Sequence, residues 1–270
     1  MSHRLGQVFL KDQNILRKIV SSADITPEDT VVEIGCGEGY LSRELAKHCR
    51  RLIIIEIDPQ CLAMAAPKLA AFEHVELVQG DFLEVGFDAV GDGRFKVVGN
   101  LPYYISTKII KRIISNKSRI DKAVVMVQKE FAKKLLAHAG NPAYVSFTLY
   151  TQFSLTSERL FHVSKNCFRP IPKVDSTVLA MTPRQDPRFP VNDDLFFALV
   201  SAAFWTRRKT LQNCLFKSRY LNIDPEFCQT EWFTKNSQKR GEMLDLEAYY
   251  TLYKAIFPFI KSYQNPKKET

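Results

Sequence analysis

The sequence has no long apolar stretch, no Cys-x-x-Cys pair and only five histidines, which are scattered along the chain. The missing apolar run excludes a membrane-spanning helix, which needs about 20 apolar residues. Scattered cysteines and histidines offer neither a disulfide framework nor metal-ligand spacing, so we expect no metal and six reduced cysteines. The N-terminus lacks the apolar core of a signal peptide, so we expect a cytoplasmic protein.

Basic residues, in contrast, are abundant. The 270 residues include 38 Lys and Arg against 29 Asp and Glu, which gives a net charge of +9 and a pI near 9.2. The excess is shared, because residues 1–186 carry 25 basic and 20 acidic side chains and residues 187–270 carry 13 and 9. With 46% hydrophobic residues the chain is globular, and its charge suits a polyanion-binding surface. The same charge would also be found in a basic soluble protein that binds no polyanion, so charge alone does not decide between the two.

A glycine-rich turn follows the first strongly apolar segment. Residues 30–34 predict a buried strand that runs directly into Gly-Cys-Gly-Glu-Gly at residues 35–39 and then into a helix. Such a turn lets the backbone approach a nucleotide cofactor closely, although dinucleotide enzymes use similar turns. The next predicted strand, residues 52–58, carries Glu56, whose carboxylate can accept both ribose hydroxyls of an adenosine-containing cofactor. Asp58 is better suited to cap the following helix.

Two further strand ends add polar groups. Residues 75–79 predict a strand that ends before Asp81 and Phe82, an acid and a ring that suit an adenine amine and its face. Residues 95–98 predict another strand, followed at residues 99–104 by Gly-Asn-Leu-Pro-Tyr-Tyr. An amide, a carbonyl fixed by a proline and an aromatic ring can hold a planar base by its exocyclic amine. A dinucleotide does not need this last motif, whereas S-adenosylmethionine with an amine substrate does.

Three other segments suit RNA. The helix predicted after Tyr104 directs Lys108, Lys111 and Arg112 outward, either to phosphates or to solvent. Phe168 begins a stiff, proline-containing loop, where its ring can form a second face for a base or pack in the core. The densest basic cluster follows Trp205 at a predicted junction between helices and suits an RNA backbone; it comprises Arg207, Arg208 and Lys209.

The order of elements predicts an α/β fold with a second domain. Strands alternate with helices up to residue 163, and residues 177–181 return as a last, antiparallel strand. Residues 183–190 have the composition of a linker, and the segments after it are helical. We therefore expect a Rossmann-like methyltransferase sheet, mostly parallel, in residues 1–184, and a smaller all-α RNA-binding domain in residues 185–270.

These motifs, in this order and spacing, resemble the ribosomal RNA adenine N6-dimethyltransferase family across nearly the whole chain. Residues 6–10 resemble the family's opening Gly-Gln-Asn-Phe-Leu, and residues 33–37, 56, 81 and 100–103 its cofactor and amine sites. The loop at residues 168–176, the Arg-Arg-Lys-Thr-Leu run at 207–211 and the pattern from Arg240 to Leu246 resemble its KsgA branch, which acts on the small ribosomal subunit.

The resemblance implies an S-adenosylmethionine-dependent enzyme that dimethylates N6 of two adjacent adenines in a hairpin near the 3′ end of 16S rRNA and releases S-adenosylhomocysteine. It implies naked rRNA or a 30S assembly intermediate as partner and a monomeric enzyme without metal. The implied cofactor residues are Val8, Leu10, Gly35, Gly37, Glu56, Asp81, Phe82 and Asn100. The implied catalytic residues are Asn100, Leu101, Pro102, Tyr103 and Phe168.

Two departures and several alternatives stay open. Val8 stands where the family usually has Asn, so only backbone contact to the cofactor could remain there, and Tyr104 stands where Asn is common. The large-subunit branch, which gives macrolide resistance, shares the first four motifs. An NAD-dependent oxidoreductase would explain the glycine turn and Glu56 but not Asn100. A non-catalytic RNA-binding assembly factor and a DNA adenine methyltransferase are the other two rivals.

Overall fold

A computed structural model describes residues 8–184 and 192–264, and the predicted motif residues Gly6 and Gln7 lie outside them. The chain divides into two compact units. The first comprises residues 1–132 and 154–183, and the second comprises residues 133–153 and 184–270. No helix among the described residues is long and apolar enough to cross a membrane.

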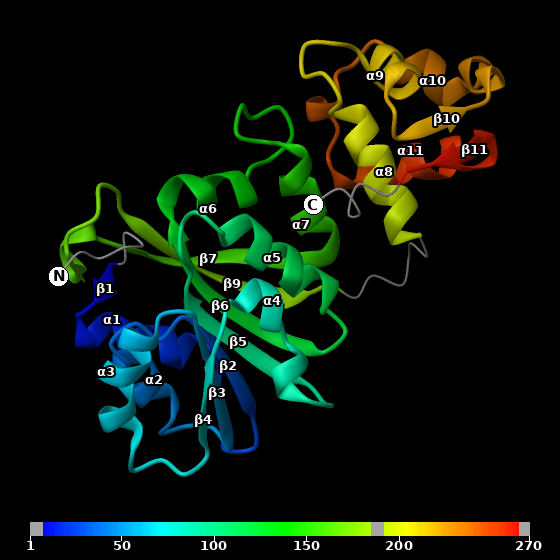
Figure 1. Cartoon of the computed structure of the whole chain (residues 1–270). Coiled ribbons are helices and arrows are strands. Elements are labelled where there is room, and N and C mark those ends of the chain that lie inside the picture. The colour runs from blue at the N-terminus through cyan, green and yellow to red at the C-terminus, as the bar shows by residue number, and fades with distance from the viewer. Residues whose placement is uncertain (1–7, 185–191, 265–270) are drawn as a thin grey trace. The chain divides into compact units, whose positions relative to one another are not determined.

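The first unit is built on a seven-stranded sheet with the order β4-β3-β2-β5-β6-β9-β7 (Figure 1). Strands β2 to β6 are parallel, β9 is antiparallel to both of its neighbours, and the predicted sheet is confirmed. The strands are β2 (Thr30–Ile34), β3 (Arg51–Glu56), β4 (Val75–Gln79), β5 (Phe95–Asn100), β6 (Ile120–Gln128), β7 (Leu155–Val163) and β9 (Ser176–Pro183).

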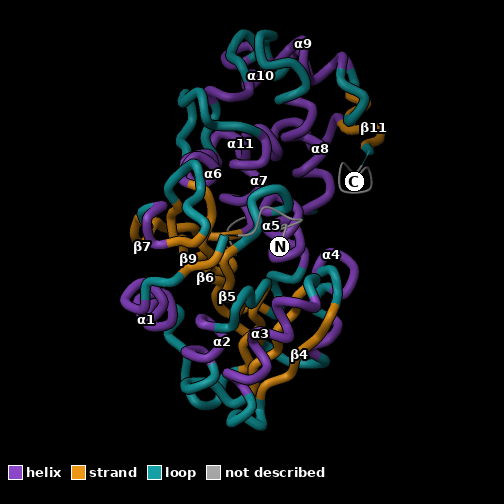
Figure 2. The backbone as a smooth tube through the Cα atoms, turned by 60° about the vertical axis from the view of Figure 1, so that its left-hand side comes forward, coloured by secondary structure: helices purple, strands orange, loops and turns teal. Residues whose placement is uncertain are grey.

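Helices cover both faces of this sheet (Figures 1 and 2). Apolar residues of α1, α2 and α3 form one core with one face of the strands, and the strongly amphipathic α5 buries four isoleucines on the other face beside α4. The helices are α1 (Gln13–Ser22), α2 (Tyr40–Leu45), α3 (Pro59–Leu69), α4 (Phe82–Val85), α5 (Ser106–Ser115) and α6 (Lys129–Leu135). The side chain of Asp12 caps α1, and that of Asp58 caps α3. Each accepts hydrogen bonds from backbone N–H groups in the first turn of its helix.

Strand order reverses between β2 and β5, since the chain runs outward from β2 to β4 and then returns beside β2 as β5. Open α/β sheets bind ligands at such a reversal, outside the carboxyl ends of the strands. A separate two-stranded ladder lies at this end of the first unit and pairs β1 (Phe9–Leu10) with β8 (Phe168–Arg169). It joins segments that are far apart in the sequence.

The second unit consists mainly of helices and adds one small sheet. Its helices are α7 (Ser146–Ser154), α8 (Asp193–Ala203), α9 (Leu211–Lys217), α10 (Glu231–Asn236) and α11 (Leu246–Ile256). Strand β10 (Leu221–Ile223) pairs antiparallel with β11 (Ile260–Tyr263), so the expectation of an all-α domain is corrected. Segment 133–153 packs here because the Phe153 ring stacks on Phe196 at 4.2 Å and the Tyr144 hydroxyl donates to the Leu244 carbonyl at 3.1 Å.

Candidate active site

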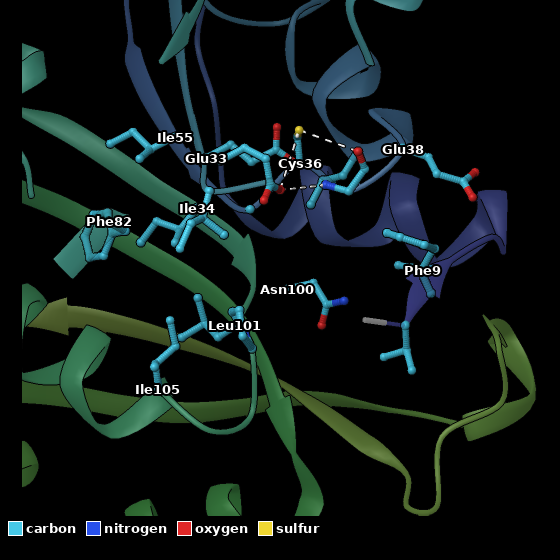
Figure 3. A pocket seen from close by; sticks show the side chains of 18 of the residues that line it. Phe9, Glu33, Ile34, Cys36, Glu38, Ile55, Phe82, Asn100, Leu101 and Ile105 are labelled. Carbon is cyan, nitrogen blue, oxygen red and sulfur yellow. Dashed lines mark hydrogen bonds between the residues drawn. The ribbon is translucent and has the colours of Figure 1, made fainter. Parts of the chain in front are cut away.

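A cavity of about 280 Å³ opens at the carboxyl ends of the central strands of the first unit (Figure 3). It collects residues from β1, the glycine turn and the ends of β3, β4 and β5. Of the residues predicted for cofactor binding and catalysis, those that line it are Val8, Leu10, Gly35, Gly37, Glu56, Asp81, Phe82, Asn100, Leu101, Pro102 and Tyr103. The structure thus brings together in one place groups that the sequence distributes over almost a hundred residues.

The glycine turn between β2 and α2 forms one wall, and its shape requires glycine. Gly37 has φ +52° and Gly39 has φ +81°, a region that side chains disfavour. A Cβ atom on Gly37 would lie 2.8 Å from the Phe9 ring, and one on Gly39 would lie 2.7 Å from the Ala65 Cβ. The missing side chains therefore let β1 and α3 close against the turn and leave its backbone facing the cavity.

Glu56, at the end of β3, is buried and holds the glycine turn in place. Its Oε2 accepts a hydrogen bond from the Gly37 N–H at 3.2 Å, and its Oε1 accepts one from the Asp58 N–H at 3.0 Å. The Cys36 thiol, a weak donor, also lies 3.8 Å from Oε2. A carboxylate has about four acceptor positions, so a lone pair remains open on Oε1. The same side chain can therefore accept hydroxyl donors from a ligand without releasing the turn.

Asp81 and Phe82 follow β4; the first supplies a hydrogen-bond acceptor and the second an apolar ring. Asp81 Oδ1 accepts from the Leu83 N–H at 2.8 Å and so caps α4. Its Oδ2 has no partner within the described residues and is available to a donor in the cavity. The Phe82 ring is buried edge-on against Phe87, with ring centroids 5.0 Å apart, and supplies an apolar wall.

The end of β5 presents an acceptor that lacks a donor. Asn100 Oδ1 is buried and has no hydrogen-bond partner among the described residues. Such an atom costs roughly 1–3 kcal/mol in an interior unless a donor arrives. The following turn is held rigidly, because the Leu101 N–H donates to the Met126 carbonyl at 3.0 Å and the Ser106 hydroxyl to the Pro102 carbonyl at 2.9 Å.

The two tyrosines after Pro102 have different surroundings. The Tyr103 hydroxyl lies 3.3 Å from the Ser176 hydroxyl, a contact that links the turn to β9. Tyr104 is 65% exposed and lines the mouth of the cavity. The departure from the family pattern at Tyr104 therefore changes the entrance rather than the floor of the cavity.

Glu33, the first residue of the predicted motif at residues 33–37, also lines the cavity, although it is not among the individual residues predicted to bind the cofactor. It lies within β2, is 0% exposed, and neither carboxylate oxygen has a hydrogen-bond partner in the described part of the chain. Burial raises the pKa of Glu33 to about 8; the neighbouring Ser42 hydroxyl opposes this rise, and the negative charge of Glu56 adds a smaller increase. One feature of the sequence indicates a special role for Glu33: it is an acid within the largely apolar strand sequence Thr-Val-Val-Glu-Ile.

The raised pKa of Glu33 predicts a specific pH dependence of stability. Its folded pKa of about 8 exceeds the ordinary value of 4.5, so the folded state binds the proton more tightly than the unfolded chain. The free energy of unfolding should therefore fall between those pH values as pH rises, by up to about 1.4 kcal/mol per pH unit. Glu33→Gln should remove this slope in urea unfolding measured from pH 5.5 to 7.5. Glu28→Gln, at an exposed site, should leave the slope unchanged, and an equal slope in both variants would refute the assignment.

Phe168 is placed differently from the expected base-stacking ring. It is 0% exposed, lies opposite Leu10 in the β1–β8 ladder and belongs to the hydrophobic core with Phe9 and Leu10. It is not among the residues that line the cavity. In the described structure its ring therefore supports the strand that lines the cavity and presents no face to it.

The basic residues predicted for RNA contact separate into engaged and available groups. On α5, Arg112 donates to the Leu83 carbonyl at 2.6 Å, which ties α5 to α4, whereas Lys108 is exposed. The pKa of Lys111 is lowered by partial burial and by the positive charge of Lys108. In the second unit, Arg207 donates to the Pro142 carbonyl at 2.8 Å, whereas Arg208 and Lys209 are exposed between α8 and α9.

Comparison with known proteins gives a consistent result. The model of the family described as ribosomal RNA adenine dimethylase matches residues 1–249. The protein named ribosomal RNA small subunit methyltransferase A of Alkaliphilus metalliredigens is 38% identical over 263 residues, which cover 94% of this chain and 91% of that protein. The protein of the same name from Clostridium botulinum is 35% identical and covers 95% of this chain and 94% of its own length.

Two solved structures have the same fold over nearly the whole chain. A dimethyladenosine transferase from Plasmodium falciparum has a TM-score of 0.79 at 26% identity and covers 93% of this chain and 99% of its own. The 23S rRNA methyltransferase ErmE has a TM-score of 0.74 at 25% identity and covers 92% and 99%. Both TM-scores are high, so the fold alone does not distinguish a small-subunit from a large-subunit enzyme, whereas the two sequence relatives are named for the small subunit.

Proposed function

The chain belongs to the ribosomal RNA adenine dimethylase family, and from that premise we propose that it methylates N6 of two adjacent adenines in a hairpin near the 3′ end of small-subunit rRNA. It is an S-adenosylmethionine-dependent rRNA adenine dimethyltransferase. The single observation that carries the reaction assignment is the buried, unpartnered Asn100 Oδ1 in the cavity. A large-subunit substrate is the alternative, since ErmE shares the fold.

The residues of the cavity fit S-adenosylmethionine. In this proposal Glu56 accepts the ribose hydroxyls, Asp81 Oδ2 accepts the adenine amine, and Phe82 packs on the adenine ring; their positions in the cavity support these roles. The orphaned Glu33 carboxylate suits the cationic ammonium of the methionyl part, because a cation would relieve the cost of ionising a buried acid. The remaining wall offers backbone groups to the cofactor, and it consists of Val8, Leu10, Gly35 and Gly37.

When bound, S-adenosylmethionine supplies an electrophilic methyl group on its sulfonium. The substrate amine of adenine is a poor nucleophile, because its lone pair is delocalised into the ring. Asn100 Oδ1 and the Leu101 carbonyl would accept its two N–H groups, which favours a tetrahedral nitrogen with a localised lone pair. The same acceptors stabilise the positive charge that develops on this nitrogen. No general base is needed to activate the amine, and the surplus proton on the methylated nitrogen would leave to solvent after transfer.

The target base needs a surface as well as acceptors. Pro102 fixes the turn, and the Tyr103 ring lines the cavity where a base would stack. Base–aromatic stacking contributes about 1–3 kcal/mol, which offsets a similar cost of unstacking the adenine. Stacking of Phe168 on the other face stays a prediction, and it requires the ring to leave the core in which the structure places it.

The decisive test of this function is methyl transfer to small ribosomal subunits that lack the two dimethyladenosines, with the modified nucleotides mapped. We expect both adjacent adenines to be modified, with one molecule of S-adenosylhomocysteine released per methyl group. Large-subunit RNA and duplex DNA serve as competing substrates, and preferential modification of either would overturn the assignment. Naked rRNA compared with a 30S assembly intermediate identifies the physiological substrate, and we expect the enzyme to act on it as a monomer in the cytoplasm.

Arg208 and Lys209, the two exposed basic residues between α8 and α9, should contribute to the salt dependence of RNA binding. Arg208→Ala combined with Lys209→Ala should weaken binding and reduce the slope of log Kd against log salt by about 1.4, since each lost phosphate contact to single-stranded RNA removes about 0.7. Filter binding at several salt concentrations measures the slope. Arg112→Ala is the matched control, because its guanidinium is engaged by the Leu83 carbonyl. A double variant with the parent slope would show that these two side chains do not contact RNA.

A further inference from the structure

An exposed aromatic and cationic cluster in the second unit has no part in the chemistry above. Trp205, just after α8, is 45% exposed. Its ring centroid lies 5.7 Å from that of Tyr220, with the two rings at 82°. The Arg219 guanidinium carbon lies 5.7 Å from the Trp205 ring and 5.3 Å from the Tyr220 ring, so one cation contacts both rings. We call these three residues the Trp205 platform.

The platform presents its indole on a fixed backbone. The backbone N–H of Trp205 donates to the Ala202 carbonyl at 3.0 Å, which continues the last turn of α8. The next turn closes through the Lys209 N–H and the Thr206 carbonyl, also at 3.0 Å. Trp205 therefore keeps nearly half of its surface exposed on a fixed backbone, beside an aromatic and a cationic neighbour.

The charge around the platform restricts the kind of partner. Residues 195–223 contain five basic side chains and no Asp or Glu. Arg208 and Lys209 are exposed, and their side chains have no ion pair or hydrogen bond to any described residue. Arg207 differs, since it bonds the Pro142 carbonyl at 2.8 Å and lies 3.7 Å from the Glu242 carboxylate. Arg207 therefore anchors the loop and leaves its two neighbours for an anionic ligand.

We propose that the Trp205 platform stacks an unpaired RNA base whose flanking phosphates contact Arg208 and Lys209. Single-stranded nucleic acid is the ligand that combines flat apolar faces with regularly spaced negative charges, and bases stack on indole rings and guanidinium planes alike. The proposal rests on the proposed function, because it takes RNA as the ligand. It adds a base contact that is distinct from the cavity for the target adenine.

The sequence offers a direct optical test, because Trp232 is the one other tryptophan. In a Trp232→Phe protein all tryptophan fluorescence comes from Trp205. Titration with a short single-stranded oligoribonucleotide should quench this fluorescence, whereas an abasic strand of the same length and charge should quench it much less. Trp205→Ala should weaken binding of the oligoribonucleotide by about fivefold to 150-fold, and Trp205→Phe, which keeps a ring, should weaken it less.

The outcomes separate the platform from the enzymatic function. Equal quenching by the abasic strand, or equal affinity of the Trp205→Ala and parent proteins, would overturn the platform even if methyl transfer proceeds. Absence of methyl transfer to small subunits would overturn the proposed function while base-dependent quenching still stood. Circular dichroism establishes that each variant is folded, and the Trp205→Phe protein provides the comparison if the Ala variant is not.

Discussion

Replacing Asn100 with Ala is expected to lower the rate of methyl transfer by at least about 10²–10³-fold, the loss seen when one preorganised hydrogen-bonding group that stabilises transition-state charge is removed. Asn100 Oδ1 has no partner among the described residues, so its favourable interaction is reserved for the substrate amine. Single-turnover transfer to small subunits measures the rate. Binding of S-adenosylhomocysteine, measured by calorimetry, should change little because Glu56 and Asp81 remain.

Stability provides an internal control for this prediction. The substitution removes a buried acceptor that lacks a donor, so Asn100→Ala should unfold at the same temperature as the parent or higher. An inactive variant of undiminished stability would identify Asn100 as a group that acts on substrate. Asn222→Ala makes the same chemical change at an exposed position in β10 and should leave the rate unchanged. Near-parental turnover by Asn100→Ala would remove the amine-binding role from the end of β5.

The sheet could be predicted largely because its central strands are buried on both faces. Continuous runs rich in Val and Ile identify β2, β3 and β5, and the Gly, Asp or Asn after each run marks its carboxyl end. Strand β7 (Leu155–Val163) is harder to recognise in the sequence, because exposed and half-buried residues make up most of it. It lies at the edge of the sheet, where one exposed side admits polar residues and weakens the apolar signal.

Pairing between distant segments was not predictable from local pattern. Strands β1 and β8 have two residues each and exist only because residues 9–10 and 168–169 meet in the folded chain. That ladder is what places Phe168 in the core and leaves no face exposed to the cavity. Sheet β10–β11 and the packing of segment 133–153 with the second unit have the same non-local origin.

The site itself was predictable to the extent that topology determines it. Parallel strands bring their carboxyl ends to one edge, so the motifs after β2, β3, β4 and β5 had to converge. The partners of long cationic side chains were not predictable, and Arg112 and Arg207 proved to bond backbone carbonyls. Glu33 was predicted only as part of the motif at residues 33–37, because its own importance derives from complete burial, a property of the packed structure.

Replacing Glu56 with Ala is expected to weaken binding of S-adenosylhomocysteine by about 10²-fold or more, because two hydrogen bonds to a charged acceptor contribute about 1.5–3 kcal/mol each. Part of the loss would be indirect. The Gly37 and Asp58 N–H groups would lose their acceptor, and the glycine turn would lose its tie to β3. Calorimetry measures the Kd, and a lower unfolding temperature should accompany the change.

Two further substitutions separate contact from scaffolding. Glu38→Ala removes another acid that lines the same cavity but pairs with Lys11, so it should change the Kd by less than Glu56→Ala does. Glu56→Gln keeps an acceptor for one of the two backbone N–H groups and should give an intermediate Kd. An unchanged Kd in Glu56→Ala would exclude a ribose contact at the end of β3. A nicotinamide dinucleotide would also use an acid at this position, so the Glu56 variants test the ribose contact, and the Asn100 variant tests the amine chemistry that is specific to an adenine methyltransferase.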